Sequence, residues 1–378
     1  MKVLRILGTR GVPASHGGFE TFAEQFARYL APRGWRVTVY CQREGCGAIS
    51  EDMWHGIRRV HVPVTEQGPL GTIIYDWKCI VHARREPGVI LTLGYNTAFF
   101  SLLYLGRGLA HLMNMDGIEY QRAKWSWPVK VWFYLNEIAG CKLSTHLIAD
   151  NPHIKTHLLR WAKASRVTMI PYASKPVTCA WADVLPQYAL VAKRYALIIA
   201  RPEPENSILE LVQAFSQKPR RLKLVILGNY RPDENSFHRR VREAASDEVC
   251  FPGAIYDSQT VDVLRCHAAL YLHGHQVGGT NPSLIEALAA GMPVMAHDNR
   301  FNRWVAEDAA VYFRGVVDAS RIFDELDNQA DAFSALSPLA LARHAACFTP
   351  EKVLADYETL ILAAAQGAFD RAPVSTLS

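Results

Sequence analysis

The sequence predicts an α/β protein made of two doubly wound parallel sheets, and three observations support this fold class. Short apolar strands alternate with amphipathic helices, and the alternation occurs twice along the chain. Loops that contain glycine lead from several strands into the helices that follow them. The chain has 378 residues, 49% of them hydrophobic and 20% charged, which suits two globular domains of ordinary size.

The first domain is predicted to span residues 1–175. A strand in "KVLRILGT" is followed by a glycine loop and an amphipathic helix in "HGGFETFAEQFARYLAPRG", and "WRVTVYCQ" is the next strand. Three more strands are predicted in "GVILTLG", "HLIAD" and "VTMIPYA". Residues 176–193 mix turn-forming residues with small apolar ones and are predicted to be a linker.

The second domain is predicted over residues 194–350, with the same alternation. A strand in "YALIIARP" precedes a helix around "NSILELVQAFS", and further strands are expected in "LKLVILGN", "EVCFPG" and "AALYLHG". Residues 351–378 hold a long helix, which follows the completed second sheet, and a tail. We therefore expect that helix to pack back across the linker.

The stretch "GGTNPSLIEALAAG", which ends at Gly291, predicts a loop and helix with a binding function. Thr280 or Asn281 can cap a helix, Pro282 suits its first position, and Gly291 suits its end. The amides of the first helical turn and the positive end of the helix dipole favour an anion, and ligands bind at such loops of parallel sheets. Capped helices after glycine loops are common in α/β proteins, so a structural role is the alternative.

Motifs for several nucleotide, metal and redox sites are absent. The place where a dinucleotide fingerprint would begin reads "GTRGVP", and the chain has no P-loop and no D-x-D motif. His153 and His157 lie four residues apart without a third ligand, which favours an ordinary helix surface over a metal site. The eight cysteines are scattered without C-x-x-C spacing and are expected to be reduced and mostly buried. No cofactor and no metal are therefore expected.

Charge is divided unevenly along the chain. Residues 1–180 contain 22 Lys and Arg against 12 Asp and Glu, whereas residues 181–378 contain 19 against 24. A basic half can meet an anionic bilayer or a phosphorylated acceptor, and no nucleic-acid signature accompanies it, so nucleic acid is not an expected partner. A solvated surface without a partner is the alternative. The start "MKVLRILGTRG" lacks the long apolar region of a signal peptide, so we expect a cytoplasmic location.

Four segments carry a resemblance to a known family. They are "GTRGVPASHGGFETFAEQFARYLAPRGWRVTVYC", "MDGIEYQRAKW", "ARPEPENSILELVQAFS" and "HGHQVGGTNPSLIEALAAGMPVMAHDNRFNR". They resemble a bacterial branch of retaining glycosyltransferases of the GT-B fold, group 1 or family 4-like, with a rhamnosyltransferase-type N-terminal domain. The resemblance covers both domains in order, and it implies two facing Rossmann-like domains with a C-terminal helix that crosses back.

The resemblance implies a metal-independent hexosyltransferase of cell-surface polysaccharide synthesis. Such an enzyme moves a sugar, with rhamnose from dTDP-rhamnose as one candidate, from a nucleotide diphosphate to a glycan or a lipid-linked glycan. It retains the anomeric configuration, and a lipid-linked acceptor would bring it to the inner face of the cytoplasmic membrane. A sugar-nucleotide epimerase of the same fold and a catalytically silent subunit that only binds a nucleotide sugar are the alternatives.

The resemblance also implies a set of donor-binding residues. Glu286 occupies the place of a carboxylate that bonds the ribose hydroxyls of the donor, and a solvated acid on the helix is the alternative. Arg201 is expected to neutralise the leaving phosphate. Gly17 and Gly18 either approach the donor or acceptor or form a tight turn. The loop and strand-end contacts to the donor are expected from His273, His275, Gly279, Thr280, Asn281, Ser283 and Leu284.

The acceptor is expected to meet the segment "MDGIEYQRAKW". Asp116 and Glu119 are candidates for orienting or deprotonating the acceptor hydroxyl, with Arg201 as the third catalytic candidate. Arg122 and Lys124 are candidates for holding an acceptor phosphate. The following aromatic and basic stretch "KWSWPVKVWFYLNEIAG" suits the headgroup layer of a membrane, and a place in the domain core is the alternative.

Three positions depart from the wider family. Gly278 stands where a second Glu is frequent, and Asn206 stands where a Lys often follows the phosphate-binding Arg by five residues. Met115 precedes Asp116, where many relatives have a His. One phosphate cation is therefore missing, and the two histidines His273 and His275 are candidates to offset the loss.

Overall fold

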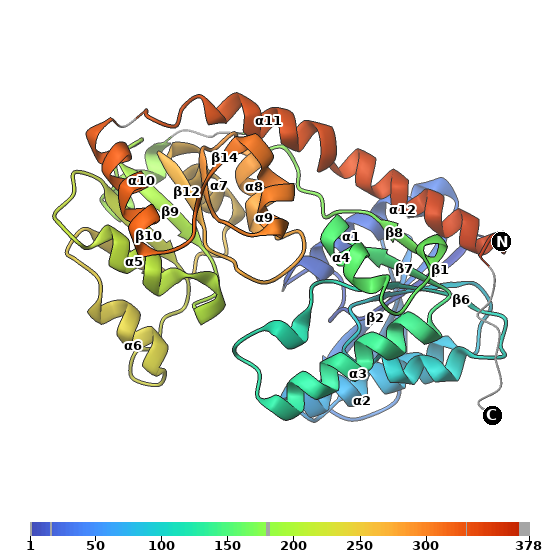
Figure 1. The fold of residues 1–378 in the computed structure, drawn as a ribbon. Helices are drawn as coiled ribbons and strands as arrows, with labels where there is room; N and C mark the ends of the chain where they lie inside the picture. The colour runs from blue at the N-terminus through green and yellow to red at the C-terminus, as the bar shows by residue number, and fades with distance from the viewer. Residues whose placement is uncertain (1, 16, 179–181, 330, 370–378) are drawn as a thin grey trace. The chain divides into compact units, whose positions relative to one another are not determined.

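The computed structural model describes residues 2–15, 17–178, 182–329 and 331–369, and the chain forms two compact units (Figure 1). The first unit comprises Met1–Tyr120, Trp127–Ile170 and Val353–Ser378. The second comprises Gln121–Ser126 and Pro171–Lys352. Each unit holds its own parallel sheet with helices on its faces, so the predicted fold class is confirmed.

The sheet of the first unit has eight strands in the order β3-β4-β2-β1-β5-β6-β7-β8, and every neighbouring pair is parallel except β3 and β4. All five side chains of the central strand β1 are buried, because helices cover both faces of the sheet. The strands are β1 (Val3–Leu7), β2 (Arg36–Glu44), β3 (Ser50–Trp54), β4 (Ile57–Val64), β5 (Val89–Leu93), β6 (Ala110–Asn114), β7 (His146–Ala149) and β8 (Val167–Met169).

The last long helix, α12 (Pro350–Ala365), lies for most of its length in the first unit and packs into the core of that unit. The ring of Tyr357 lies 4.6 Å from that of Phe22 on α1, and its hydroxyl accepts a hydrogen bond of 2.8 Å from Asn114 Nδ2. Trp35 Nε1 donates to Glu358 Oε1 over 2.9 Å. The helices of the first unit are α1 (Gly17–Leu30), α2 (Gly68–Ala83), α3 (Trp127–Leu143), α4 (Pro152–Leu158) and most of α12, with the 3₁₀ helices η2 (Ala98–Tyr104) and η3 (Glu119–Gln121).

The sheet of the second unit has six parallel strands in the order β11-β10-β9-β12-β13-β14. Its strands are β9 (Tyr195–Ile199), β10 (Lys223–Leu227), β11 (Val249–Gly253), β12 (Leu270–His273), β13 (Val294–His297) and β14 (Ala310–Phe313). Its helices are α5 (Ile208–Phe215), α6 (Ser236–Glu243), α7 (Ser258–His267), α8 (Pro282–Ala289), α9 (Arg300–Ala306), α10 (Val316–Asn328) and α11 (Leu336–Cys347).

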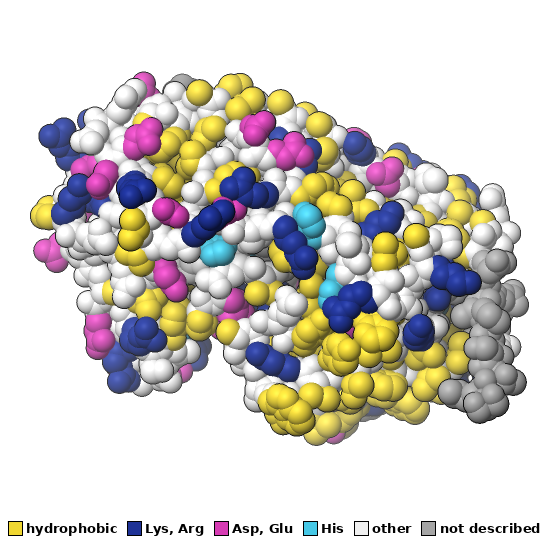
Figure 2. Space-filling view, in the orientation of Figure 1, with side chains coloured by type: hydrophobic (Ala, Val, Ile, Leu, Met, Phe, Trp, Pro, Cys, Tyr) yellow, Lys and Arg dark blue, Asp and Glu magenta, His cyan; other side chains and the backbone are white. Residues whose placement is uncertain are grey.

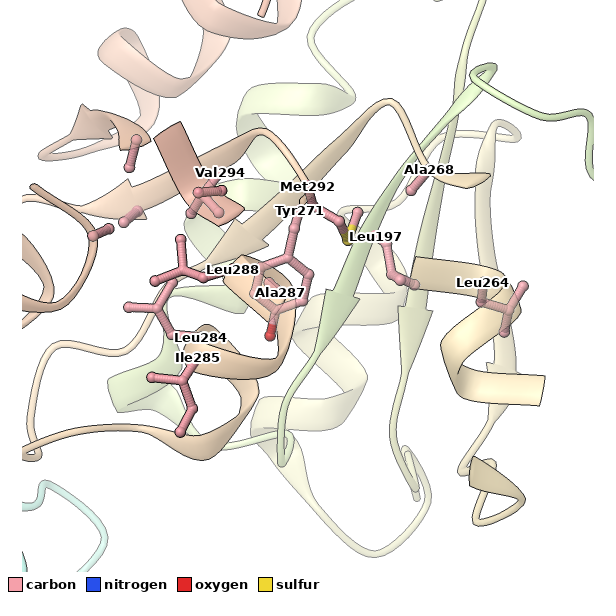
Figure 3. Packing of buried hydrophobic residues seen from close by; sticks show 14 of the residues in the cluster. Leu197, Leu264, Ala268, Tyr271, Leu284, Ile285, Ala287, Leu288, Met292 and Val294 are labelled. Atoms are coloured by element: carbon pink, nitrogen blue, oxygen red, sulfur yellow. The ribbon is translucent and has the colours of Figure 1, made fainter. Parts of the chain in front are cut away.

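Helix α8 is anchored to this sheet by its apolar side chains. Leu284, Ile285 and Leu288 are fully buried and belong to one cluster with Tyr271 of β12 and Val294 of β13 (Figure 3). Burying a side chain of this size stabilises a fold by about 1.5–3 kcal/mol relative to exposure. The packing fixes the direction in which the first turn of α8 points.

The structure corrects three expectations. Between the second and third predicted strands it has an unpredicted antiparallel hairpin, β3 and β4, followed by α2. His157 is not on a helix surface: it is buried, and its Nε2 hydrogen-bonds Glu137 Oε1 over 2.9 Å. Cys266 is disulfide-bonded, so it is not reduced, whereas six cysteines are free; Cys179 lies outside the described residues.

Candidate active site

The two central strands of the second sheet, β9 and β12, are neighbours in space but are separated by β10 and β11 in sequence. This is a topological switch point, where the loops after the two strands diverge and ligands of parallel α/β sheets bind. The loop after β9 carries Arg201, and the loop after β12 carries His275 and leads into α8. The predicted donor residues of this unit therefore gather at the place where the fold favours a ligand.

Hydrogen bonds hold the two loops together. Ser207 Oγ donates to the carbonyl of Gly274 over 2.7 Å, and the amide of Gln276 donates to the carbonyl of Glu205 over 2.9 Å. A Cβ on Gly274 would lie 2.0 Å from the carbonyl oxygen of Asn206, so only glycine fits there. The loops after β9 and β12 therefore form one rigid edge at the carboxyl ends of these strands.

The loop before α8 is largely buried. Thr280 and Leu284 are buried, and the neighbouring Gly279 is buried as well. Asn281 occupies the N-cap position, but its side chain makes no capping hydrogen bond, unlike the cap predicted from the sequence. The hydroxyl of Ser283, in the first turn, hydrogen-bonds that of Tyr271. The first-turn amides, with the positive end of the helix dipole, form an arrangement that suits an anion.

Glu286, one turn further along α8, is held by a buried arginine that sequence reasoning missed. Arg265 on α7 pairs with Glu286 Oε2 and lies 3.0 Å from Asp262 Oδ1. The side chain of Glu286 is 37% exposed and that of Arg265 only 8%. Burial raises the pKa of Glu286, Arg265 lowers it, and Asp262 raises it. A carboxylate offers about four acceptor positions, so Glu286 can accept from Arg265 and from ligand hydroxyls together.

His273 and His275 form a stacked pair, with ring centroids 4.3 Å apart and an interplanar angle of 10°. Burial lowers the pKa of His273 well below its ordinary value. The pKa of His275 is lowered to about 3 by burial first and then by the charges of Arg122 and Arg201. Both pKa shifts favour the neutral rings, and the expectation that these histidines offset the missing phosphate cation stays a prediction.

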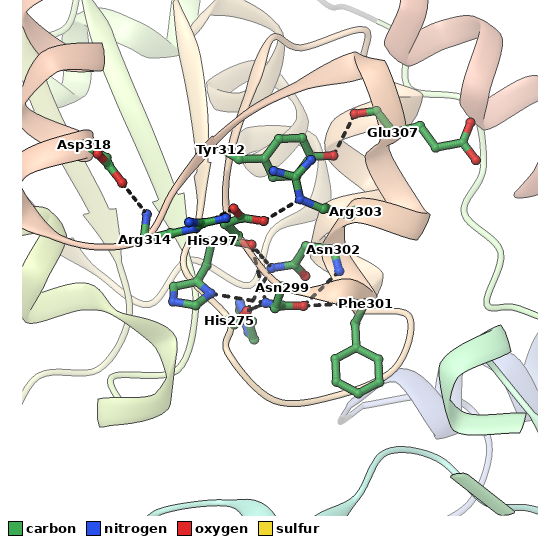
Figure 4. Close-up of polar contacts among 11 residues, drawn as sticks. His275, His297, Asn299, Phe301, Asn302, Arg303, Glu307, Tyr312, Arg314 and Asp318 are labelled. Atoms are coloured by element: carbon green, nitrogen blue, oxygen red, sulfur yellow. Dashed lines mark hydrogen bonds and ion pairs between the residues drawn. The ribbon is translucent and has the colours of Figure 1, made fainter. Parts of the chain in front are cut away.

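The backbone of His275 is fixed by two asparagines of the following elements (Figure 4). Asn299 Nδ2 and Asn302 Nδ2 each donate to the carbonyl of His275 over 2.9 Å. Asn299 also caps α9 by accepting from the amides of Phe301 and Asn302. These contacts join the loop after β12 to the loop after β13, and no local pattern predicts them because the partners lie more than twenty residues apart.

The loop after β9 has its own internal support. The side chain of Asn206 is 5% exposed, and its Nδ2 donates to the carbonyl of Arg201 over 2.8 Å. Asn206 therefore positions the backbone of Arg201, whose side chain is exposed. Glu205 is 4% exposed, and neither of its carboxylate oxygens has a hydrogen-bond partner among the described residues. A buried carboxylate of this kind is costly unless a polar ligand or water meets it.

The predicted acceptor cations Arg122 and Lys124 belong to the second unit, together with Arg201. Lys124 Nζ lies 3.9 Å from Glu203 Oε1, and Arg122 is close enough to His275 to lower its pKa. Sequence reasoning grouped these two residues with Asp116. The structure groups them with the residues expected to bind the donor.

Asp116 and Glu119 lie in the first unit, directly after β6. Asp116 has a φ of 47°, which is uncommon for a residue other than glycine, and its amide donates to Asn114 Oδ1 over 2.9 Å. The amide of Glu119 donates to the hydroxyl of Tyr95 over 2.9 Å. The loop is held in one conformation, and backbone conformations of this kind cluster at functional sites.

Gly17 and Gly18 begin α1, and Gly17 has a φ of 65°. The loop from β1 to α1 is fastened by two acids of that helix, because Glu20 Oε1 accepts from the amide of Arg10 over 3.0 Å and Glu24 Oε2 accepts from the amide of Ala14 over 2.8 Å. The glycines thus open a tightly held loop at the carboxyl end of β1.

A groove in the first unit was not predicted from the sequence. Its volume is about 780 Å³, and it lies where β2 and β4 end and α2 begins, beside the loop after β1. The chain positions that form it are far apart in sequence, which explains why no motif revealed it. Its polar side chains, Arg10, Ser15, Gln42, Glu44, Thr65, Glu66, Gln67 and Thr72, are referred to below as the polar groove.

Residues 187–331 match the family described as glycosyl transferases group 1, and residues 1–175 match a domain of unknown function, DUF1972. The chain carries a group 1 glycosyltransferase domain. No curated protein sequence matches this chain.

Solved structures of the GT-B fold resemble the chain over nearly its whole length. A sucrose-phosphate synthase from Thermosynechococcus elongatus is 19% identical, with a TM-score of 0.78 over 95% of this chain and 98% of that chain. HepE from Anabaena, in complex with UDP, is 13% identical, with a TM-score of 0.75 over 96% and 100%. An α,α-trehalose 6-phosphate synthase from Burkholderia multivorans is 11% identical, with a TM-score of 0.73 over 97% of each chain. The domain match thus assigns residues 187–331 to the group 1 glycosyltransferases, and the solved structures show that the chain as a whole has the GT-B fold.

Two kinds of feature, a membrane-spanning helix and a cluster of metal ligands, are absent from the described ranges. None of their helices is long and apolar enough to cross a membrane. In the same ranges, no three His, Cys, Asp or Glu side chains gather as ligands for a metal ion.

Proposed function

We propose that this glycosyltransferase moves a sugar from a nucleoside diphosphate to a glycan acceptor in the synthesis of a cell-surface polysaccharide. The observation that carries the proposal is the edge formed by the loops after β9 and β12, which brings Arg201, the first turn of α8 and Glu286 to one topological switch point. The amides of α8 and Arg201 match the diphosphate of a nucleoside diphosphate, and the carboxylate of Glu286 matches its ribose.

The donor is proposed to bind along this edge. The first-turn amides of α8 would receive the diphosphate, and Glu286, steadied by Arg265, would accept hydrogen bonds from the ribose hydroxyls. Solved structures of HepE contain UDP or UDP-glucose, which makes uridine nucleotides the first donors to test. The resemblance to rhamnosyltransferases makes dTDP-rhamnose the second, although its deoxyribose offers Glu286 one hydroxyl fewer.

The reaction is proposed to break the bond between the anomeric carbon and the phosphate oxygen while a bond to the acceptor oxygen forms. Negative charge grows on the departing diphosphate, and Arg201 and the dipole of α8 would stabilise it. With retention of configuration, the acceptor proton passes to the departing phosphate, and Asp116 orients the acceptor hydroxyl. We propose that no metal takes part, because the amides and Arg201 already supply positive groups for the diphosphate.

The acceptor is proposed to bind the polar groove through its sugar units. The groove offers hydroxyl, amide and carboxylate groups that both donate and accept hydrogen bonds, as sugar hydroxyls require. Its formal charge comes from one Arg and two Glu, so it does not favour a polyanion. If the acceptor is linked to a lipid diphosphate, as we propose, the enzyme works peripherally at the inner face of the cytoplasmic membrane.

The proposal is tested by incubating the protein with UDP-, dTDP- and GDP-sugars, each with and without an extract of lipid-linked glycans from a bacterial membrane. We expect one nucleotide class to yield free nucleoside diphosphate and a lengthened glycan. Conversion of the sugar nucleotide without any acceptor would instead indicate the epimerase. Binding without turnover under all conditions would indicate the silent subunit.

Two substitutions on α8 and α10 make the test specific. Glu286→Gln removes the charge of the proposed ribose ligand but keeps its shape, whereas Glu325→Gln changes an exposed acid on α10 of the same unit. We expect the first to raise the KM for the donor about tenfold, because a hydrogen bond to a charged group contributes about 1.5–3 kcal/mol. The second should leave the KM unchanged, and equal effects of the two would contradict the proposal.

A further inference from the structure

We propose that α2, η2 and α3 of the first unit together form a face that docks on an anionic lipid bilayer. Hydrophobic side chains gather over α2 and α3, with Lys and Arg beside them (Figure 2). This surface is called the docking face below. It comprises the exposed apolar residues Leu70, Trp77, Phe99, Leu102, Leu105, Trp127, Trp132 and Leu135 and the basic residues Arg107, Lys130 and Lys142.

The apolar residues of η2 and α3 face outward at helical spacing. Phe99 and Leu102 of η2 lie three positions apart, on one face of a 3₁₀ helix, and are 40% and 51% exposed. Leu105, which follows η2 directly, is 39% exposed. On α3, Trp127 and Leu135 lie eight residues apart on one face and are 77% and 44% exposed. The pattern is therefore a property of the folded surface, and core packing does not explain it.

The aromatic residues are held in position rather than loosely exposed. The ring of Trp77 on α2 packs edge-on against Phe100 of η2 at 5.1 Å. Trp132 Nε1 donates to the carbonyl of Asn96 over 2.8 Å. Each of these tryptophans is therefore held by a contact within the protein and still exposes apolar ring surface. This arrangement suits the boundary between headgroups and acyl chains.

No exposed acid lies on the three elements or their connecting ends, residues 68–83, 98–107 and 127–143, all of which are described. Asp76 accepts a hydrogen bond of 2.7 Å from Thr97 Oγ1, and burial raises its pKa to about 6. Glu137 is 1% exposed and hydrogen-bonds His157. The exposed charges of the face are therefore all positive, and positive charges close to a bilayer are attracted to anionic headgroups.

The exposed apolar residues, together with exposed charges on these elements that are all positive, point to an anionic bilayer more than to a second copy of this chain. A self-complementary interface would place the basic residues of one copy against the same residues of the other, with no acid on the face to pair them. Lipid phosphates pair them directly. The purpose of docking, to reach a lipid-linked acceptor, rests on the proposed function, but the docking itself does not.

The test is co-sedimentation of the full chain with large vesicles of phosphatidylcholine, with and without phosphatidylglycerol, at low and high salt. We expect binding to the anionic vesicles that weakens as salt rises. Leu102→Ser with Trp127→Ser removes apolar contacts, and Lys130→Glu with Lys142→Glu reverses two positive charges of the docking face. Each pair should weaken binding on the order of tenfold or more.

Matched controls lie on exposed positions of the second unit. Tyr256→Ser removes an aromatic ring that is 90% exposed, and Arg321→Glu reverses an exposed charge on α10; neither should change vesicle binding. Circular dichroism of every variant confirms that it is folded. Loss of vesicle binding in the face variants alone, with donor hydrolysis unchanged, would support docking.

Two results would overturn the proposal. One is equal vesicle binding by the wild type and both face variants, or no binding by any of them. The other is a concentration-dependent dimer of the wild type that the face variants abolish while no vesicle binding is seen, which would assign the face to a second copy. A protein that binds vesicles but transfers no sugar would contradict the proposed function and leave docking intact.

Discussion

The two sheets carry their polar loops at the carboxyl ends of their strands, but they build those loops in different ways. In the second unit, the edge formed by the loops after β9 and β12, called the donor edge here, is supported by buried groups. Gly274 lies close to the carbonyl of Asn206, two asparagines donate hydrogen bonds to the carbonyl of His275, and Arg265 pairs with Glu286. In the first unit the polar groove is lined by side chains that mostly reach solvent. The difference fits the proposed function, in which the buried edge is a preorganised site for the nucleotide and the open groove an adaptable one for the glycan.

The largest effect is expected from Gly274→Ala in the donor edge. Its Cβ would meet the backbone carbonyl of Asn206 at 2.0 Å, so the loops after β9 and β12 must move apart. We expect a loss of stability of about 3 kcal/mol and no measurable donor binding. The control is Gly315→Ala, whose Cβ would meet nothing within 4 Å. Thermal unfolding and calorimetric titration check both, and wild-type donor affinity in Gly274→Ala would refute the rigid edge.

Arg265→Met should be the next largest change, and its effect should depend on pH. Arg265 lowers the pKa of Glu286 against the effect of burial, so removing it raises that pKa. The carboxylate is then protonated at a higher pH than in the wild type, so the pH below which donor affinity falls should be higher in the variant. Wild type and variant are titrated at the same pH values, because protonation of the ligand then affects both affinities equally. An unchanged pH profile would show that Arg265 does not act through Glu286.

A smaller effect is expected from Asn206→Ala. The substitution removes the 2.8 Å hydrogen bond to the carbonyl of Arg201, which is worth about 1 kcal/mol. Donor affinity should fall about fivefold, while the affinity for the free nucleoside should not change, because Arg201 is proposed to act on the phosphates. If both affinities fell equally, Asn206 would instead support the nucleoside end of the site.

The smallest effect is expected in the polar groove. Gln42→Ala and Thr65→Ala each remove one hydrogen-bonding group from an open surface with several others. The KM for the glycan acceptor should rise about twofold to fivefold, since one hydrogen bond contributes about 0.5–1.5 kcal/mol. Hydrolysis of the donor without acceptor should stay at the wild-type rate. A change in donor hydrolysis alone would place the groove outside the acceptor site.

The sequence predicted what depends on local patterns. The alternation of strands and helices, the span of α8 and the place of Glu286 in it all follow from neighbours a few residues apart. The fold of the second unit could therefore largely be predicted from the sequence. The hairpin of β3 and β4 was missed because its edge strand, β3, is polar and almost wholly exposed, so no apolar alternation marks it.

The groups that support the site could not be predicted because their partners are distant in sequence. Arg265 lies 21 residues before Glu286, and Asn302 lies 27 residues after His275. The burial of His157 depends on Glu137, twenty positions earlier on another helix. In each case a polar side chain shows no distinctive sequence pattern, and its role becomes visible only when the fold supplies its partner.

The most direct test of the proposed donor site compares UDP with 2′-deoxy-UDP in wild type and Glu286→Gln by calorimetric titration. If Glu286 bonds the ribose hydroxyls, the deoxy ligand should bind the wild type about tenfold more weakly, and the difference should shrink to about twofold in the variant. A penalty for the deoxy ligand that is equally large in Glu286→Gln would contradict that role for Glu286.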